Sequence, residues 1–132
     1  MPTITGGHHI ALTVTDVERS AAWYADLFAM QVVMQGDEEE VQFRVLADPE
    51  SGWLIGLRQY PGKHSGEFDE LRTGLDHFAF GVSSRAELEA WAAELSRRQV
   101  PYSPVRETPI GAVIVFRDPD NIQLEFWLPA DS

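Results

Sequence analysis

The chain contains no cysteine. This absence excludes a disulfide framework, a thiolate nucleophile and any cysteine-based zinc or iron–sulfur site, so a metal ion would have to be held by histidine and carboxylate side chains. A cysteine-free sequence also suits the cytoplasm, which is where we expect the protein.

Long apolar runs are missing as well. No stretch reaches the run of about 18 apolar residues that a membrane-spanning helix needs, and residues 1–7 have no basic start followed by an apolar segment, which a secretory signal would show. We therefore expect a soluble, unprocessed chain without a membrane partner.

Basic residues are scarce, with 10 Lys and Arg against 21 Asp and Glu and a net charge of −11. The mean field of such a protein repels phosphate backbones, so nucleic acid is not an expected partner. The acidic cluster at residues 37–40 (Asp-Glu-Glu-Glu) is interpreted as a solvated turn between two strands.

The sequence does contain an internal repeat. His9 and His77 each open the pattern His-x-Ala-x-x-Val, and His77 follows His9 by 68 positions. The same offset separates two further pairs, Trp23 and Trp91, and Leu27 and Leu95. With 132 residues and 44% hydrophobic content, we expect a single domain, residues 1–132, made of two modules at about 8–60 and 75–128 joined by a connector at 61–74.

Hydrophobic periodicity predicts the same element order in both modules. The first module has a strand at 8–15, a helix that ends near Ala29, and strands at about 31–35, 41–46 and 53–59. The second has a strand at 75–82, a helix that begins at a capping box of residues 84–87, and strands around 102–106, 112–116 and 122–127. Trp23 and Trp91 fall on the apolar helix stripes and are expected in the core.

Strand alternation brings three possible metal ligands to one face. His9 and His77 occupy equivalent positions of equivalent strands, and Glu125 lies on the face of the last strand opposite Ile122, Leu124 and Phe126. Two imidazoles and one carboxylate can hold a divalent ion and leave positions open for water and substrate. We therefore predict a metal site formed by His9, His77 and Glu125, whereas His8 should point to the opposite face.

Other candidate residues follow from the same alternation. Aligning the two Asp-Pro turns places Gly56 where the second module has Glu125, so no fourth protein ligand is expected. Arg58 and Gln123 fall on the cavity face and are candidates for substrate binding. Tyr102 and His64 are candidates for catalytic proton transfer.

The element order, the two His-x-Ala-x-x-Val openings and the segment Asp-Pro-Asp-Asn-Ile-Gln-Leu-Glu at residues 118–125 resemble the vicinal oxygen chelate superfamily of glyoxalases, bleomycin-resistance proteins and extradiol dioxygenases. The resemblance covers nearly the whole chain. It implies an α+β fold in which two βαβββ modules form an eight-stranded, cup-shaped mixed sheet with helices on the outer face. In that family the cup surrounds a divalent metal, whose ligands map onto His9, His77 and Glu125, and members commonly form homodimers, as we expect here.

The resemblance implies a small divalent-metal-dependent enzyme that chelates vicinal oxygens of a small-molecule substrate. An extradiol-type dioxygenase with Fe²⁺ is the first expectation, and another glyoxalase-like lyase or isomerase with Mn²⁺, Zn²⁺ or Ni²⁺ is the next. Extradiol enzymes usually carry additional units and a further catalytic histidine and tyrosine. In this sequence only His64 and Tyr102 are candidates for these two roles.

Two alternatives stay open. One is a metal-independent protein that sequesters an aromatic antibiotic, as bleomycin-resistance relatives do, and the other is a thiol transferase similar to fosfomycin-resistance enzymes. Ala11 departs from the resemblance to those transferases, which share a threonine at the equivalent position. Gly56 departs from glyoxalase I and methylmalonyl-CoA epimerase, which use a fourth side-chain ligand.

Overall fold

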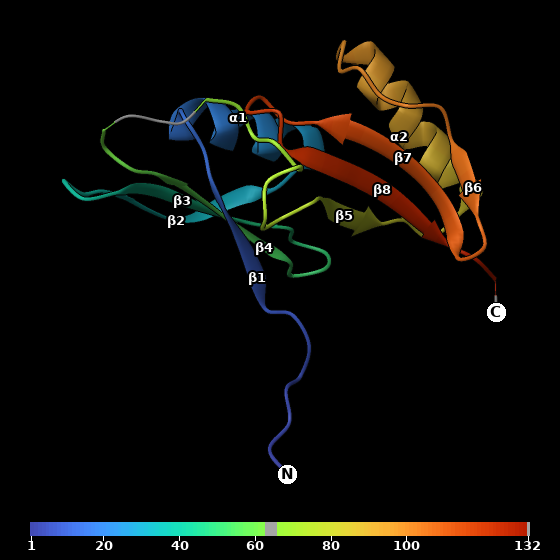
Figure 1. The fold of residues 1–132 in the computed structure, drawn as a ribbon, viewed down its shortest axis with the longest axis horizontal. Coiled ribbons are helices and arrows are strands. Elements are labelled where there is room, and N and C mark those ends of the chain that lie inside the picture. Colours follow the sequence, from blue (N-terminus) through green and yellow to red (C-terminus); the bar gives the residue numbers. More distant parts are fainter. Residues whose placement is uncertain (63–65, 132) are drawn as a thin grey trace. The chain divides into compact units, whose positions relative to one another are not determined.

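The computed structural model describes residues 1–62 and 66–131 (Figure 1). By its internal contacts the chain divides into two compact units, Met1–Ser65 and Gly66–Ser132. The boundary between them falls inside the connector that the sequence predicts.

The first unit is one βαβββ module. Its elements are β1 (His9–Thr13), α1 (Val17–Phe28), β2 (Gln31–Asp37), β3 (Gln42–Ala47) and β4 (Leu54–Gln59). The strands form a four-stranded sheet in the order β1-β4-β3-β2, in which β1 runs parallel to β4 and the other pairs are antiparallel.

The second unit repeats this plan. Its elements are β5 (Phe78–Gly81), α2 (Arg85–Arg97), β6 (Arg106–Thr108), β7 (Gly111–Arg117) and β8 (Gln123–Pro129). The sheet order is β5-β8-β7-β6, again with the first and last strands of the module parallel. The α+β class and the tandem βαβββ modules are therefore confirmed, and the eight strands are divided between two four-stranded mixed sheets.

Each helix begins and ends where local chemistry allows it. The Asp16 side chain accepts a hydrogen bond from the Arg19 amide at 3.0 Å, and Ser84 accepts one from the Glu87 amide at 3.1 Å, so both first turns are capped. Helix α1 ends at Ala29, which has a left-handed backbone with φ of 54°.

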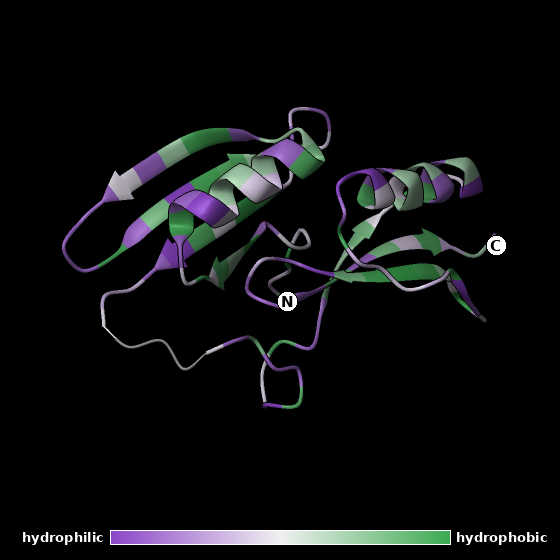
Figure 2. Ribbon diagram, turned by 90° about the horizontal axis from the view of Figure 1, so that it is seen from above, coloured by the Kyte–Doolittle hydropathy of each residue, from purple (hydrophilic) through white to green (hydrophobic). Residues whose placement is uncertain are grey.

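Hydrophilic and hydrophobic residues are mixed along both helices (Figure 2). Tyr24 and Leu27 of α1 and Leu88 and Leu95 of α2 are buried. The predicted core tryptophans are half-buried, and the ring of Trp91 stacks on Phe126 of β8 with 4.5 Å between ring centroids. In each module, one sheet face therefore packs against the helix.

The predicted strand at 102–106 is wrong. Tyr102 forms only an isolated bridge with Phe116, and the regular strand β6 does not begin until Arg106. Pro104 has no amide hydrogen to donate to a neighbouring strand. The Ser103 hydroxyl accepts the Val115 amide at 2.9 Å, so a side chain here replaces a backbone carbonyl.

No helix among residues 1–62 and 66–131 is long and apolar enough to cross a bilayer.

Candidate metal centre

Glu125 and His77 come together in the second unit. Glu125 lies on β8 between Leu124 and Phe126, whose side chains pack on the α2 side, so alternation directs its carboxylate to the other face. His77 immediately precedes β5, which pairs with β8 through Ala79 and Glu125. The His77 Nε2 atom lies 3.3 Å from Glu125 Oε1, and the Glu125 side chain is only 9% exposed.

Asp76 orients the imidazole of His77. Its Oδ1 atom lies 2.7 Å from His77 Nδ1, and Gln123 donates from Nε2 to the Asp76 carbonyl at 3.0 Å and to Oδ1 at 3.2 Å. A carboxylate that accepts the Nδ1 proton leaves the Nε2 lone pair for a metal ion. The sequence analysis missed Asp76, whose only signal was its position next to His77.

Gln123 is in turn hydrogen-bonded to Arg117 of β7. The Arg117 guanidinium donates to Gln123 Oε1 at 3.3 Å and forms two hydrogen bonds of 2.9 Å with Glu70. Hydrogen bonding to Arg117 lowers the pKa of Glu70 to about 2. The side-chain amide of Gln123, predicted as a substrate-binding residue, is thus hydrogen-bonded to both Asp76 and Arg117.

The pair His77 and Glu125 fits a divalent ion. Nitrogen and oxygen ligands lie about 2.0–2.2 Å from such an ion, so two neighbouring ligands of one ion are about 3.0–3.5 Å apart. The observed 3.3 Å falls within this range. Imidazole nitrogen and carboxylate oxygen also suit Fe²⁺, Mn²⁺, Zn²⁺ and Ni²⁺.

His9 belongs to the first unit. It is exposed on the face of β1 opposite the buried Leu12, as alternation predicts. Its Nδ1 atom lies 2.7 Å from His8 Nδ1, and the two rings meet edge to face. The predicted opposite orientation of His8 is wrong because β1 begins at His9, so strand alternation does not extend to His8.

Neither unit alone assembles the predicted triad. Among the described residues no group of three or more His, Asp and Glu side chains suited to a metal ion occurs. The structure brings two of the predicted ligands, His77 and Glu125, together in the second unit. The third predicted ligand, His9, belongs to the first unit.

The strand registers explain why the first unit has no ligand equivalent to Glu125. Ala11 of β1 pairs with Gly56 of β4, and Ala79 of β5, which follows Ala11 by 68 positions, pairs with Glu125 of β8. Gly56 therefore occupies the position of the carboxylate, as the alignment of the two Asp-Pro turns predicts.

A pocket of about 320 Å³ lies over this part of the first unit. Mostly apolar groups line it, together with two histidines and two arginines: His8, His9, Ala11, Met34, Phe43, Arg44, Val45, Leu54, Gly56, Leu57 and Arg58. In the second unit, the side chain of Glu125 occupies the space above the equivalent position. Gly56 has no side chain, so in the first unit this space is part of the pocket.

Arg58 is held at this pocket by two aromatic rings. Its Nε atom donates to the Tyr60 hydroxyl at 2.9 Å, and its guanidinium carbon lies 5.9 Å from the Phe43 ring centroid and 5.6 Å from that of Tyr60. The Phe43 ring in turn lies against Gly36, where an added Cβ would collide with the edge of the ring. A larger residue at position 36 would therefore displace Phe43 from its present position beside Arg58.

Of the two catalytic candidates, Tyr102 is not brought to the pair of His77 and Glu125. The Tyr102 hydroxyl lies 2.6 Å from Ser96 Oγ of α2, so it is directed to the helix side of its module. His64 lies outside the described residues.

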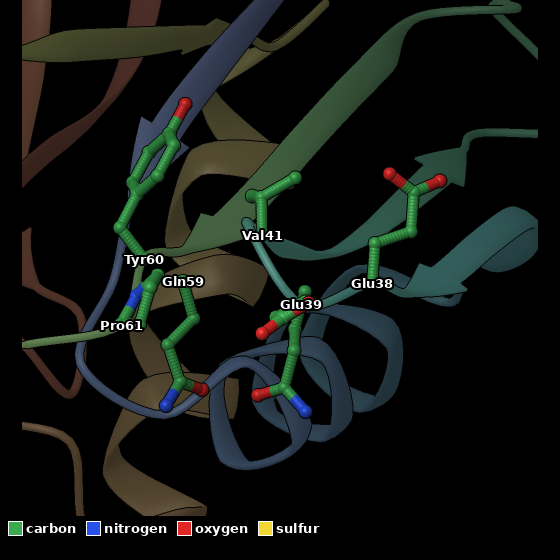
Figure 3. Close-up of a pocket in the computed structure, with 7 residues that line it drawn as sticks. Glu38, Glu39, Val41, Gln59, Tyr60 and Pro61 are labelled. Carbon is green, nitrogen blue, oxygen red and sulfur yellow. The ribbon is translucent and has the colours of Figure 1, made fainter.

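A second hollow, of about 190 Å³, lies beside the acidic turn between β2 and β3. Figure 3 shows Gln59, Tyr60 and Pro61 along one side and Glu38 and Glu39 along the other. Gln59 Oε1 accepts the Val17 amide at 2.8 Å, so it serves the first turn of α1. The acidic residues are exposed in the turn, as predicted, and we assign them no function.

Comparisons with known proteins agree with this architecture. The family model for the Glyoxalase/Bleomycin resistance protein/Dioxygenase superfamily matches residues 6–126. The uncharacterized protein YwkD of Bacillus subtilis (strain 168) is 28% identical over 123 residues, which are 91% of this chain and 94% of that protein.

Two solved structures have the same fold. A glyoxylase/bleomycin resistance protein/dioxygenase domain from Frankia sp. EAN1pec has a TM-score of 0.89 and 34% identity, and the match covers 97% of this chain and 100% of that one. The fosfomycin resistance protein FosX from Listeria monocytogenes, solved with Mn(II) and a sulfate ion, has a TM-score of 0.70 and 19% identity over 97% of this chain and 95% of its own. The chain therefore belongs to the glyoxalase/bleomycin resistance protein/dioxygenase superfamily.

Proposed function

We propose that the protein is a divalent-metal-dependent enzyme that binds two neighbouring oxygen atoms of a small-molecule substrate, with His9, His77 and Glu125 as the metal ligands. The observation that carries this proposal is the 3.3 Å approach of His77 Nε2 to Glu125 Oε1, with Asp76 on the other imidazole nitrogen. The metal binding of the distant FosX relative supports it only as a property of the superfamily.

In this proposal each protein group has a defined task. Asp76 accepts the Nδ1 proton and fixes the ring, so His77 presents Nε2 as a ligand. Glu125, nearly buried, supplies a carboxylate oxygen and one negative charge. When bound, the divalent ion would supply Lewis acidity that stabilises negative charge on substrate oxygens.

Ring-opening dioxygenation of a catechol is the first specific reaction we propose, with Fe²⁺ as the metal. Two histidines and one carboxylate with open positions are the ligand set of non-haem iron oxygenases. Gly56 at the position equivalent to Glu125 supports a three-ligand set, because it has no side chain to occupy a further position. We further propose that the enzyme acts as a homodimer.

Anaerobic reconstitution tests this function. Wild-type protein, His77→Ala and Glu125→Gln are each loaded with Fe²⁺ or Mn²⁺ and given oxygen and a panel of simple catechols, and the absorbance of the ring-opened product is followed. We expect turnover in the wild type alone, with a loss of at least about 100-fold in both variants. Turnover that survives Glu125→Gln unchanged would contradict the assigned ligands.

A second candidate function is sequestration of an aromatic compound without chemistry. The apolar lining of the pocket beside His9 favours it, since apolar walls and an aromatic ring are typical of such sites. Calorimetry on metal-free protein distinguishes the two functions. Tight binding of an aromatic antibiotic without metal, together with no turnover by the loaded protein, would favour sequestration.

A further inference from the structure

We propose that Arg58 binds a carboxylate group of the substrate, in the pocket of the first unit that also contains His9. This inference deepens the proposed function, on which it rests for the metal-binding end of the substrate. It identifies the substrate class as apolar or aromatic monocarboxylates that carry vicinal oxygens.

Arg58 and His9 lie at opposite ends of the same sheet face. His9 pairs with Leu54 and Thr13 pairs with Arg58, so the two ends are four residues apart on β4. At about 3.3 Å per residue this separation is about 13 Å along the strand. An elongated substrate could therefore reach from one end to the other.

The groups between the two ends are small or apolar. Ala11 and Gly56 form one cross-strand pair, and Val45 of β3 is the partner of Gly56 on the other side. None of the three can hydrogen-bond through its side chain, and Gly56 leaves room above the sheet. This middle section suits an aromatic ring or a short apolar chain.

The guanidinium of Arg58 is already held in place. The hydrogen bond to Tyr60 uses Nε, and the rings of Phe43 and Tyr60 lie near the guanidinium, so the two terminal nitrogens are left for a ligand. Two parallel hydrogen bonds from one guanidinium match the two oxygens of a carboxylate. An ordered side chain loses less conformational entropy on binding than a mobile one.

The charge around Arg58 indicates a ligand with a single negative charge. The protein has a net charge of −11, yet none of the ion pairs among the described residues involves Arg58 and no Asp or Glu lines the pocket. Arg44, the other arginine of the lining, is buried and bound to Asp37 at 2.9 Å. One uncompensated guanidinium balances one carboxylate, whereas a phosphate ester carries about two charges at pH 7 and calls for more donors.

Binding of a matched pair of probes to metal-free protein tests this inference. The probes are 4-phenylbutyrate and its uncharged amide, and their dissociation constants are measured by NMR titration for the wild type, Arg58→Gln and Arg58→Lys. Arg106→Gln is the control, because Arg106 is an exposed arginine of β6 outside the pocket. The affinity for the amide shows whether each variant keeps its fold.

We expect the wild type and Arg106→Gln to bind the carboxylate at least about tenfold more tightly than the amide, since a charge-assisted hydrogen bond is lost with the amide. Arg58→Gln should abolish this preference without weakening amide binding, and Arg58→Lys should retain part of it. Equal binding of both probes by the wild type, an unchanged preference in Arg58→Gln, or no saturable binding of 4-phenylbutyrate at millimolar concentration would overturn the inference.

The metal is absent from this experiment, so the two proposals fail separately. A carboxylate preference that depends on Arg58, in a protein that binds no divalent ion after reconstitution, would contradict the proposed function and leave the role of Arg58 standing. Metal binding by His77 and Glu125 without any carboxylate preference would contradict the role of Arg58 and leave the proposed function standing.

Discussion

At the scale of single residues, the candidate site depends on which atoms of His77 are free. Strand alternation was enough to predict that Glu125 lies away from Leu124 and Phe126, because alternate side chains of a strand point to opposite faces. It could not predict that Asp76 contacts the imidazole, since that contact depends on side-chain rotamers in a segment before β5. The orientation of His8 was predicted wrongly for a related reason. His8 also precedes its strand, and alternation applies only within a strand.

Replacement of Asp76 tests its positioning role. We expect Asp76→Ala to weaken Mn²⁺ binding by about 10–100-fold, because the imidazole loses the carboxylate that fixes its proton and its orientation. Asp76→Asn, which keeps a hydrogen-bonding side chain without the charge, should recover part of the affinity.

The measurement is a calorimetric titration with Mn²⁺, accompanied by the electron paramagnetic resonance spectrum of the bound ion. Glu89→Ala serves as the control, because Glu89 is an exposed carboxylate of α2. Equal affinity and an unchanged spectrum in Asp76→Ala would show that Asp76 does not position the ligand.

At the scale of elements, repetition made most of the fold predictable. The helix boundaries followed from capping residues and apolar stripes, and the second module could be checked against the first. The segment 102–106 was predicted wrongly as a regular strand, because Ser103 contributes a side-chain oxygen where the periodicity suggested backbone pairing alone. Nor did the sequence indicate that Glu70, in the segment before β5, would be bound to Arg117 of β7.

The pair of Glu70 and Arg117 should make the stability of the second unit depend on pH. The folded pKa of Glu70 is about 2, below its ordinary value of 4.5, so the pair stabilises the folded state fully above pH 4.5 and loses its effect as the pH falls through 2. We therefore expect Glu70→Gln to lower the Tm slightly at pH 7 and to have a much smaller effect on it near pH 2.

Thermal unfolding of both proteins between pH 2 and pH 7 checks this dependence. Glu67→Gln provides a control in the same segment, since Glu67 is exposed and takes part in no ion pair among those the structure describes. A Tm difference between wild type and Glu70→Gln that is the same at both ends of this range would contradict the assigned interaction.

At the scale of the whole molecule, the proposed ligands come from both units of the chain. The sequence indicated this division, because each His-x-Ala-x-x-Val motif opens one module. If one ion is bound by His9, His77 and Glu125, it binds only when both units are folded, and so it should link their unfolding.

We expect a divalent ion at about 100 times its dissociation constant to stabilise the folded chain by about 2.7 kcal/mol and to produce a single unfolding transition. His9→Ala should lose most of this stabilisation. His8→Ala, which removes the neighbouring imidazole that is not a proposed ligand, should keep it. Calorimetric scans with and without Mn²⁺ measure the effect. Equal losses in the two variants would argue against a specific role for His9.

The most direct test of the metal site is the metal content of the protein itself. Wild-type protein and His77→Ala are purified without added metal or chelator, reconstituted with Fe²⁺ or Mn²⁺, freed of unbound ions and analysed by mass spectrometry for elements. We predict one divalent ion per chain in the wild type and almost none in His77→Ala. A wild type that retains no divalent ion after reconstitution, or a variant that retains as much, would contradict the account.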